Sequence, residues 1–306
     1  MDSDPADAFA LLGAPTRMAT LSAFADAARE RERPVTLTFT ELFKATDEAT
    51  TAGFAYHLRQ LRDHYLEKVE RDDGEAGYRL TDAGRRVVRA LAAGVYTERV
   101  DREPVAIPEP CPLCDGDLRA ATADNVVTVG CADCDQNVCR LSFPPGGFAS
   151  HDTPEELLTA VDRLHRDRVR LLREGTCPDC GGETTATVDT VRKEDEPGPA
   201  HATLYCTACG ERVRCPVTVA LLDHPALVAF GYDHGVAPDE HPVWNVGKAF
   251  SETVLSADPV CVRVGWRLGD EELAVLVGAD CSVGHVERIE LQTSSERDEL
   301  TGSAAA

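Results

Sequence analysis

The chain has 306 residues, of which 43% are hydrophobic, so it can form two or three compact units and is not wholly disordered. Its formal net charge of −22, with only four lysines against 27 arginines, is typical of a halophilic protein whose dense carboxylate surface keeps it hydrated. No apolar run approaches the ~18–20 residues of a membrane span, and the N-terminus lacks a signal-peptide pattern. We therefore expect a cytoplasmic protein without a membrane partner.

The first hundred residues carry the helices of a small α-rich domain. Residues 7–30 predict two helices broken at Gly13, and Thr38 three residues before Glu41 predicts a capping box. Residues 51–61 predict a helix that buries Phe54, Leu58 and Leu61, because these residues recur at helical spacing. A hairpin over residues 66–80 and a last helix from Thr81 or Asp82 complete the order of a winged helix-turn-helix, to which we assign residues 1–103.

Three stretches then carry a family resemblance. "LLGAPTRMATL", "YHLRQLRDHYLEKV" and "GYRLTDAGRRVV" are similar to the entry, recognition helix and wing exit of ArsR-like regulators, over about residues 7–95. This resemblance implies that the helix from residue 50 reads duplex DNA in a homodimer, with the last helix (Val87, Val88, Leu91, Val95) and the first helix as dimer surface. The implied base-edge or groove contacts are Thr50, Thr51, Tyr56, Arg59 and, unless it packs or caps instead, His57; the implied phosphate contacts are Arg62, Arg71 and Arg79.

The charge of the N-terminal part suits DNA binding better than the charge of the remaining chain does. Residues 1–104 have a net charge of −4, whereas residues 105–306 have −18. In a salt-rich cytoplasm, where long-range phosphate attraction is already screened, an acidic DNA reader is expected to depend on base-edge hydrogen bonds and shape.

Two cysteine quartets follow residue 110. The pairs "CPLC" and "CADC" supply Cys111, Cys114, Cys131 and Cys134, and the pairs "CPDC" and "CTAC" supply Cys177, Cys180, Cys206 and Cys209. CxxC pairs at zinc-ribbon spacing place four thiolates around one ion. We predict two structural zinc ions, since four thiolates leave no coordination position for water or substrate.

The remaining cysteines read as core residues. Cys139 and Cys215 follow the last ligand of each quartet by five and six residues, so we expect them on returning strands, buried rather than ligating, with a redox role as the alternative. Cys261 and Cys281 lie in strand-like apolar contexts.

The other elements give an α+β fold. We assign residues 104–149 to a first zinc ribbon, 150–175 to a connecting helix, 176–220 to a second ribbon, 221–292 to a helix with two or three antiparallel strands, and 293–306 to a disordered tail. The proline-rich residues 102–110 predict a stiff extended spacer, and a helix after residue 219 is expected to restart near Pro225. His224, His234 and His241 read as structural or capping residues, because they share no helix face at ligand spacing.

Two functions are consistent with this organisation. The first is a transcriptional regulator in which the acidic ribbon module, similar to one attached to ArsR-like proteins of halophilic archaea, serves dimerisation, sensing or protein contacts. The alternative is a protein–protein adaptor of the transcription machinery that uses the same modules. We expect no enzyme, since the sequence offers no nucleophile–base pair, phosphate loop or open metal site.

Overall fold

A computed structural model of the protein describes residues 4–30, 35–71, 74–193 and 196–291. The chain divides into two compact units: residues 1–100 with residues 144–150, and residues 101–143 with the chain from residue 151 onwards. The disordered tail predicted for residues 293–306 lies outside the described residues. Within the described ranges, no helix is both long enough and apolar enough to cross a membrane.

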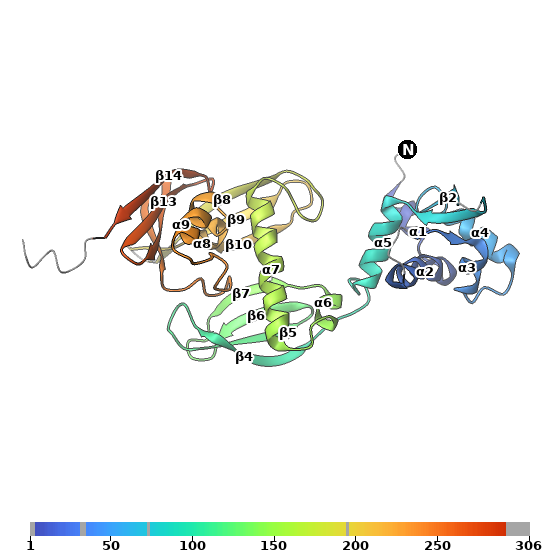
Figure 1. Ribbon diagram of the computed structural model, residues 1–306, viewed down its shortest axis with the longest axis horizontal. Coiled ribbons are helices and arrows are strands. Elements are labelled where there is room, and N and C mark those ends of the chain that lie inside the picture. Colours follow the sequence, from blue (N-terminus) through green and yellow to red (C-terminus); the bar gives the residue numbers. More distant parts are fainter. Residues whose placement is uncertain (1–3, 31–34, 72–73, 194–195, 292–306) are drawn as a thin grey trace, which may run out of the picture. The chain divides into compact units, whose positions relative to one another are not determined.

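The first unit is built from short helices and a three-stranded antiparallel sheet of order β1-β3-β2 (Figure 1). The helices and hairpin expected over this stretch are present. Their bounds are α1 Pro5–Ala10, α2 Pro15–Glu30, β1 Leu37–Thr38, α3 Phe39–Lys44, α4 Thr51–Leu61, β2 Leu66–Glu70, β3 Ala76–Leu80 and α5 Asp82–Ala92.

Side-chain caps fix where these helices begin. Thr38 and Glu41 form the reciprocal capping box expected from their spacing, and Thr81 accepts a hydrogen bond from the N–H of Gly84. The core face predicted for the 51–61 helix is confirmed, because Phe54, Leu58 and Leu61 are all buried. They pack with residues from α2, α3, α5 and the sheet, including Leu21, Phe24, Leu37, Leu42, Tyr65, Leu66 and Val88. Val88 is therefore a core residue and not part of an exposed dimer surface.

A five-residue helix from much later in the chain joins this unit. Helix α6 (Pro145–Ala149) buries Pro145 and Phe148, and the N–H of Gly146 donates to the carbonyl of Ala93 over 2.9 Å. A side chain at Gly146 would lie 3.2 Å from the backbone of Ala93, so glycine permits this close approach. The segment assigned from sequence to the end of the first ribbon thus packs with the N-terminal helices.

The second unit begins with a four-stranded antiparallel sheet. Its strands, in the order β4-β5-β6-β7, are β4 Arg102–Pro110, β5 Asp117–Ala123, β6 Val126–Cys131 and β7 Asn137–Ser142. The predicted stiff spacer is wrong, because residues 102–110 form an edge strand that pairs with β5. Proline is compatible with this position, since an edge strand needs its N–H groups on one side only. We call residues 102–142 the first ribbon.

A long helix separates this sheet from a second one. Helix α7 (Pro154–Arg173) starts at the capping box of Thr153 and Glu156, as predicted, and Gly175 follows its end with a φ of +91°. Strands β8 Thr184–Lys193, β9 Glu196–Cys206 and β10 Arg212–Pro216 then form an antiparallel sheet of order β10-β9-β8. β8 and β9 form a hairpin paired out to Lys193 and Glu196, and both strands pack against α7. We call residues 176–216 the second ribbon.

The C-terminal part adds two helices and a four-stranded meander. Helix α8 (Val217–Leu221) ends shortly before Pro225, and α9 (Pro225–Asp233) begins there, as the sequence indicated. Strands β11 Phe250–Ala257, β12 Val260–Leu268, β13 Glu271–Gly278 and β14 Val283–Glu290 pair in chain order, so the sheet has four strands and not two or three. Strand β11 was missed because alternate exposed residues give it little apolar character. It packs against β9, which links the meander to the second ribbon.

Candidate metal centres and the exposed helix

The first quartet gathers four sulfurs at the end of the first ribbon. Cys111 follows β4 and Cys131 ends β6, and the four Sγ atoms lie within 4.8 Å of one another. Sγ of Cys111 is 4.0 Å from that of Cys134, and Sγ of Cys114 is 3.6 Å from that of Cys131. These distances are too long for disulfides and close to the ~3.8 Å between thiolates that surround one zinc ion tetrahedrally.

The second quartet repeats this geometry. Sγ of Cys177 lies 3.6 Å from that of Cys209, and Sγ of Cys180 lies 3.5 Å from that of Cys206. Gly182 is packed tightly here, because a Cβ at this position would lie 2.8 Å from Cβ of Ala208 and 3.1 Å from Sγ of Cys180. Each CxxC pair of the sequence therefore contributes to a compact group of four thiols that is close enough to hold a metal ion.

Each of the four CxxC pairs is followed by a residue in the left-handed region. These residues are Asp115 (φ 61°), Asp135 (φ 55°), Gly181 (φ 73°) and Gly210 (φ 80°). Their backbone turns the chain back so that both sulfurs of a pair point to the same centre, and glycine or aspartate accepts this conformation at low cost. An Asp or Gly stands directly after every pair in the sequence, and this local signal indicates the turn.

Backbone N–H groups lie close to several of the sulfur atoms and stabilise the thiolate form that binds a cation. The N–H of Leu113 lies 3.4 Å from Sγ of Cys111, that of Asp133 lies 3.3 Å from Sγ of Cys131, and that of Ala208 lies 3.4 Å from Sγ of Cys206. Hydrogen bonds from the N–H groups of Cys134 and Asp133 lower the pKa of Cys131 to about 7, and those of Cys209 and Ala208 lower the pKa of Cys206 to about 6. Neighbouring thiols raise the pKa of Cys114 and Cys209, so one thiolate per quartet forms most readily. A donor set of four thiols fits a thiophilic ion such as zinc.

Other cysteines are buried away from the quartets. Cys139 lies on β7 and Cys215 on β10, the equivalent strands of the two ribbons. Burial raises the pKa of Cys139 to about 12 and that of Cys281 to about 11, and it raises the pKa of Cys215 further. These thiols stay protonated at neutral pH, which favours the core interpretation over a reactive redox role.

Helix α4 presents one exposed face beside the hairpin. Thr50 caps the helix by accepting a hydrogen bond from the N–H of Gly53 over 3.1 Å. Thr51 and Arg59 are exposed, and Tyr56 exposes 51% of its surface. Arg59 forms no hydrogen bond or ion pair with another residue of the part that the structure describes. The helix therefore offers hydroxyl, phenol and guanidinium groups to a partner.

The remaining residues predicted to touch DNA already contact other residues of the protein. Nε2 of His57 lies 3.7 Å from a carboxylate oxygen of Glu48, and its Nδ1 lies 3.5 Å from the guanidinium of Arg17, so His57 packs against its own unit. Arg79 donates to Glu67 across the hairpin over 2.6 Å. Arg62 is exposed and lies 3.5 Å from Asp63, and the half-buried Arg71 is also engaged with neighbouring groups.

The three histidines set apart as structural have ordinary roles. His224 caps α9 by accepting a hydrogen bond from the N–H of Ala226, and His234 bridges the carbonyl of Phe230 and the carboxylate of Glu271. The backbone carbonyl of His241 accepts from Arg166. Among the described residues, only the two cysteine quartets form a group that could hold a metal ion.

Family comparisons divide the chain much as its structure does. The family described as "Domain of unknown function (DUF7347)" matches residues 5–91, which run from the start of α1 to the end of α5. The family described as "Domain of unknown function (DUF7351)" matches residues 108–283, which include both quartets and most of the C-terminal meander. No curated protein matches the chain. Because the second match spans more than half of the sequence, the chain belongs to the DUF7351 family.

Proposed function

We propose that the protein is a DNA-binding transcriptional regulator with an ArsR-like winged helix-turn-helix and two structural zinc ions. It acts as a homodimer whose α4 helices enter successive major grooves about 34 Å apart. The acidic second unit serves as its regulatory or interaction module.

The observation that carries this proposal is the exposed face of α4. The helix starts at a side-chain cap, buries Phe54 and Leu58 and leaves Thr51, Tyr56 and Arg59 outside. Hydroxyl groups on the first two turns of such a helix, and a guanidinium on its last turn, are suited to hydrogen-bond base edges. The three-stranded sheet of order β1-β3-β2, with its hairpin after α4, supports this proposal, because a winged helix requires such a hairpin.

The test is selection of bound duplexes from a random DNA pool at about 2 M KCl, where nonspecific phosphate attraction is screened. We expect an enriched palindromic motif for the wild type and its loss for Arg59→Ala. Arg119→Ala removes the same charge from an exposed position on β5 and should bind like the wild type. Failure to enrich any motif, with fold and metal content intact, would refute the proposal.

Metal content tests the zinc assignment separately. We expect two zinc ions per chain by elemental analysis of protein purified without added metal, and one ion in a Cys131→Ser variant. A chain that is fully folded with neither ion bound would contradict a structural role.

One observation favours a second candidate, a protein–protein adaptor. The Arg79–Glu67 pair neutralises the one basic residue of β3 that was predicted to contact phosphate. If duplex selection yields nothing, capture of protein partners by α4 would be the next experiment, again with Arg59→Ala and Arg119→Ala compared.

A further inference from the structure

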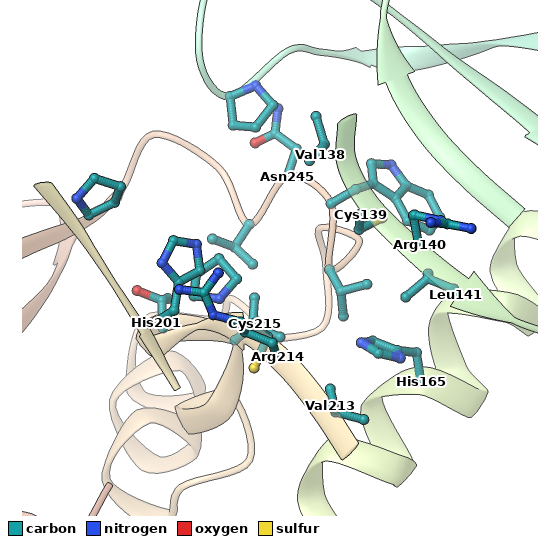
Figure 2. A pocket seen from close by; sticks show the side chains of 18 of the residues that line it. Val138, Cys139, Arg140, Leu141, His165, His201, Val213, Arg214, Cys215 and Asn245 are labelled. Atoms are coloured by element: carbon teal, nitrogen blue, oxygen red, sulfur yellow. The ribbon is translucent and has the colours of Figure 1, made fainter. Parts of the chain in front are cut away.

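A cavity lies between the two ribbons within the second unit. Its volume is about 830 Å³, which falls in the range of small-molecule binding sites. Figure 2 shows Val138, Cys139, Arg140 and Leu141 of β7 on one side and His201 with the β10 residues on another. The two strands that follow equivalent metal-binding pairs thus face the same space, with His165 of α7 between them.

Hydrogen bonds hold the third wall, residues 243–248, in place. The N–H of Val243 donates to Asp162 of α7 over 2.7 Å, and the side-chain amide of Asn245 donates to the carbonyl of Pro110 over 2.6 Å. The indole N–H of Trp244 reaches Glu109 over 3.3 Å. The cavity is therefore preformed, and a ligand would not have to order this wall.

The charge of the lining is opposite to that of the protein. Five arginines and lysines but only three carboxylates line the cavity, in a chain whose formal net charge is −22. All three carboxylates are already engaged: Asp115 with Lys248 at 2.7 Å, Glu211 with Arg168 at 2.6 Å, and Glu252 with the N–H and hydroxyl of Thr218 at 2.7 and 2.6 Å.

Arg140 differs from the other cationic residues that line the cavity. Arg214 pairs with Asp189 at 3.0 Å, and Arg212 lies over the ring of Tyr205. Arg140, by contrast, has no hydrogen-bond or ion-pair partner among residues 4–30, 35–71, 74–193 and 196–291. A guanidinium without a partner at the rim of a preformed cavity favours an anionic group of a ligand.

Neutral polar groups and apolar surface complete the lining. His165 forms no hydrogen bond with the residues that the structure describes, and burial, aided by the charges of Arg168 and Arg166, lowers its pKa to about 4. Its imidazole is therefore uncharged at neutral pH and can donate or accept one hydrogen bond. Trp244, Val213 and Leu141 supply buried apolar walls.

We propose that this cavity binds a small organic anion, whose carboxylate, sulfonate or phosphate pairs with Arg140 while an apolar body of ring size lies against Trp244, Val213 and Leu141. The site is independent of α4, so its test does not depend on DNA binding. Because Leu113, which lies between the cysteines of the first CxxC pair, also lines the cavity, the ligand would lie beside the first quartet as well as the second ribbon.

The test uses a fluorescent anion and its uncharged parent. Zinc-loaded full-length protein is titrated with anilinonaphthalene sulfonate and with phenylnaphthylamine, which has the same rings but no charge. We expect saturable binding of one sulfonate per chain and about tenfold weaker binding in Arg140→Gln, with phenylnaphthylamine unaffected by the substitution. Arg163→Gln, an exposed arginine of α7 outside the cavity, should leave sulfonate binding unchanged.

A second variant tests the position of the probe. Val213→Phe adds volume to the wall and should abolish binding of both dyes, provided that zinc content and circular dichroism match the wild type. Equal sulfonate affinity in wild type and Arg140→Gln would overturn the proposal. So would binding of phenylnaphthylamine as tight as that of the sulfonate, because the cavity would then select apolar surface alone.

Discussion

The first ribbon follows each CxxC pair with an aspartate, whereas the second follows each pair with a glycine. All four residues adopt positive φ angles between 55° and 80°. The sulfur distances agree as well, at 3.6–4.0 Å in the first site and 3.5–3.6 Å in the second. The backbone path around each cysteine quartet is therefore constrained more strictly than the identity of the turning residue.

The ribbons differ more in what surrounds them. β8 and β9 pack against α7, and β9 also packs against α8 and β11, while the N–H of Val188 donates to the carbonyl of Ala279 over 2.7 Å. The strands of the first ribbon pack mainly against one another. The second ribbon is thus part of a larger core, and we expect the first to depend more on a bound metal ion.

Removing one ligand from each site is expected to have the largest effect. Cys111→Ser and Cys177→Ser should each lose one metal ion, whose binding contributes on the order of 10 kcal/mol to folding. Hydrogen exchange should rise only in β4–β7 for Cys111→Ser. For Cys177→Ser it should rise in β8–β10 and also in β11–β13. Identical exchange patterns in the two variants would show that the surroundings do not distinguish the ribbons.

A smaller effect is expected from adding one methyl group beside each site. Gly182→Ala would press on Ala208 and on Sγ of Cys180, and we expect about tenfold weaker metal affinity at the second site. Gly116→Ala would press on the carboxylate and on Cβ of Asp133, the latter at 2.8 Å, but none of its three nearest atoms is a sulfur, so the first site should change less. Competition with a chromophoric chelator measures both affinities, and the reverse order would contradict the close packing at Gly182.

The two ribbons share the cavity that His165 lines, and the titration of His165 tests how that cavity affects stability. Its folded pKa is about 4 and its unfolded value about 6.5, so the unfolded chain takes up the proton first as the pH falls. Stability contributed by the neutral imidazole is complete above pH 6.5 and is lost towards pH 4. His165→Gln should flatten this part of the unfolding curve, whereas the exposed His285→Gln should follow the wild type.

Exchanging the turning residues should have the smallest effect. Asp135→Gly removes a side chain from a left-handed position and should stabilise the first ribbon by about 0.5–1 kcal/mol, while Gly210→Ala should destabilise the second by about 1 kcal/mol. Thermal unfolding of the zinc-loaded protein measures both changes. A destabilised Asp135→Gly would mean that the carboxylate itself supports the turn.

The sequence predicted those features that depend on neighbouring residues. The capping boxes at Thr38 and Thr153, the restart at Pro225 and the eight cysteines of the quartets all follow local rules, and the structure contains them. The features that it missed depend on how whole strands and loops meet, which the local sequence does not show. Residues 102–110 look like a spacer until β5 lies beside them, and the cavity requires β7, β10 and residues 243–248 to meet.

Helix α6 changes how the two units are joined. Because residues 144–150 belong with the N-terminal helices, the chain passes between the units at residues 100–101, 143–144 and 150–151. A single proteolytic cut near residue 101 would therefore release residues 1–100 but leave residues 144–150 of the same unit on the other fragment. A fragment that ends at residue 103 would lack the segment that buries Phe148 and pairs with Ala93.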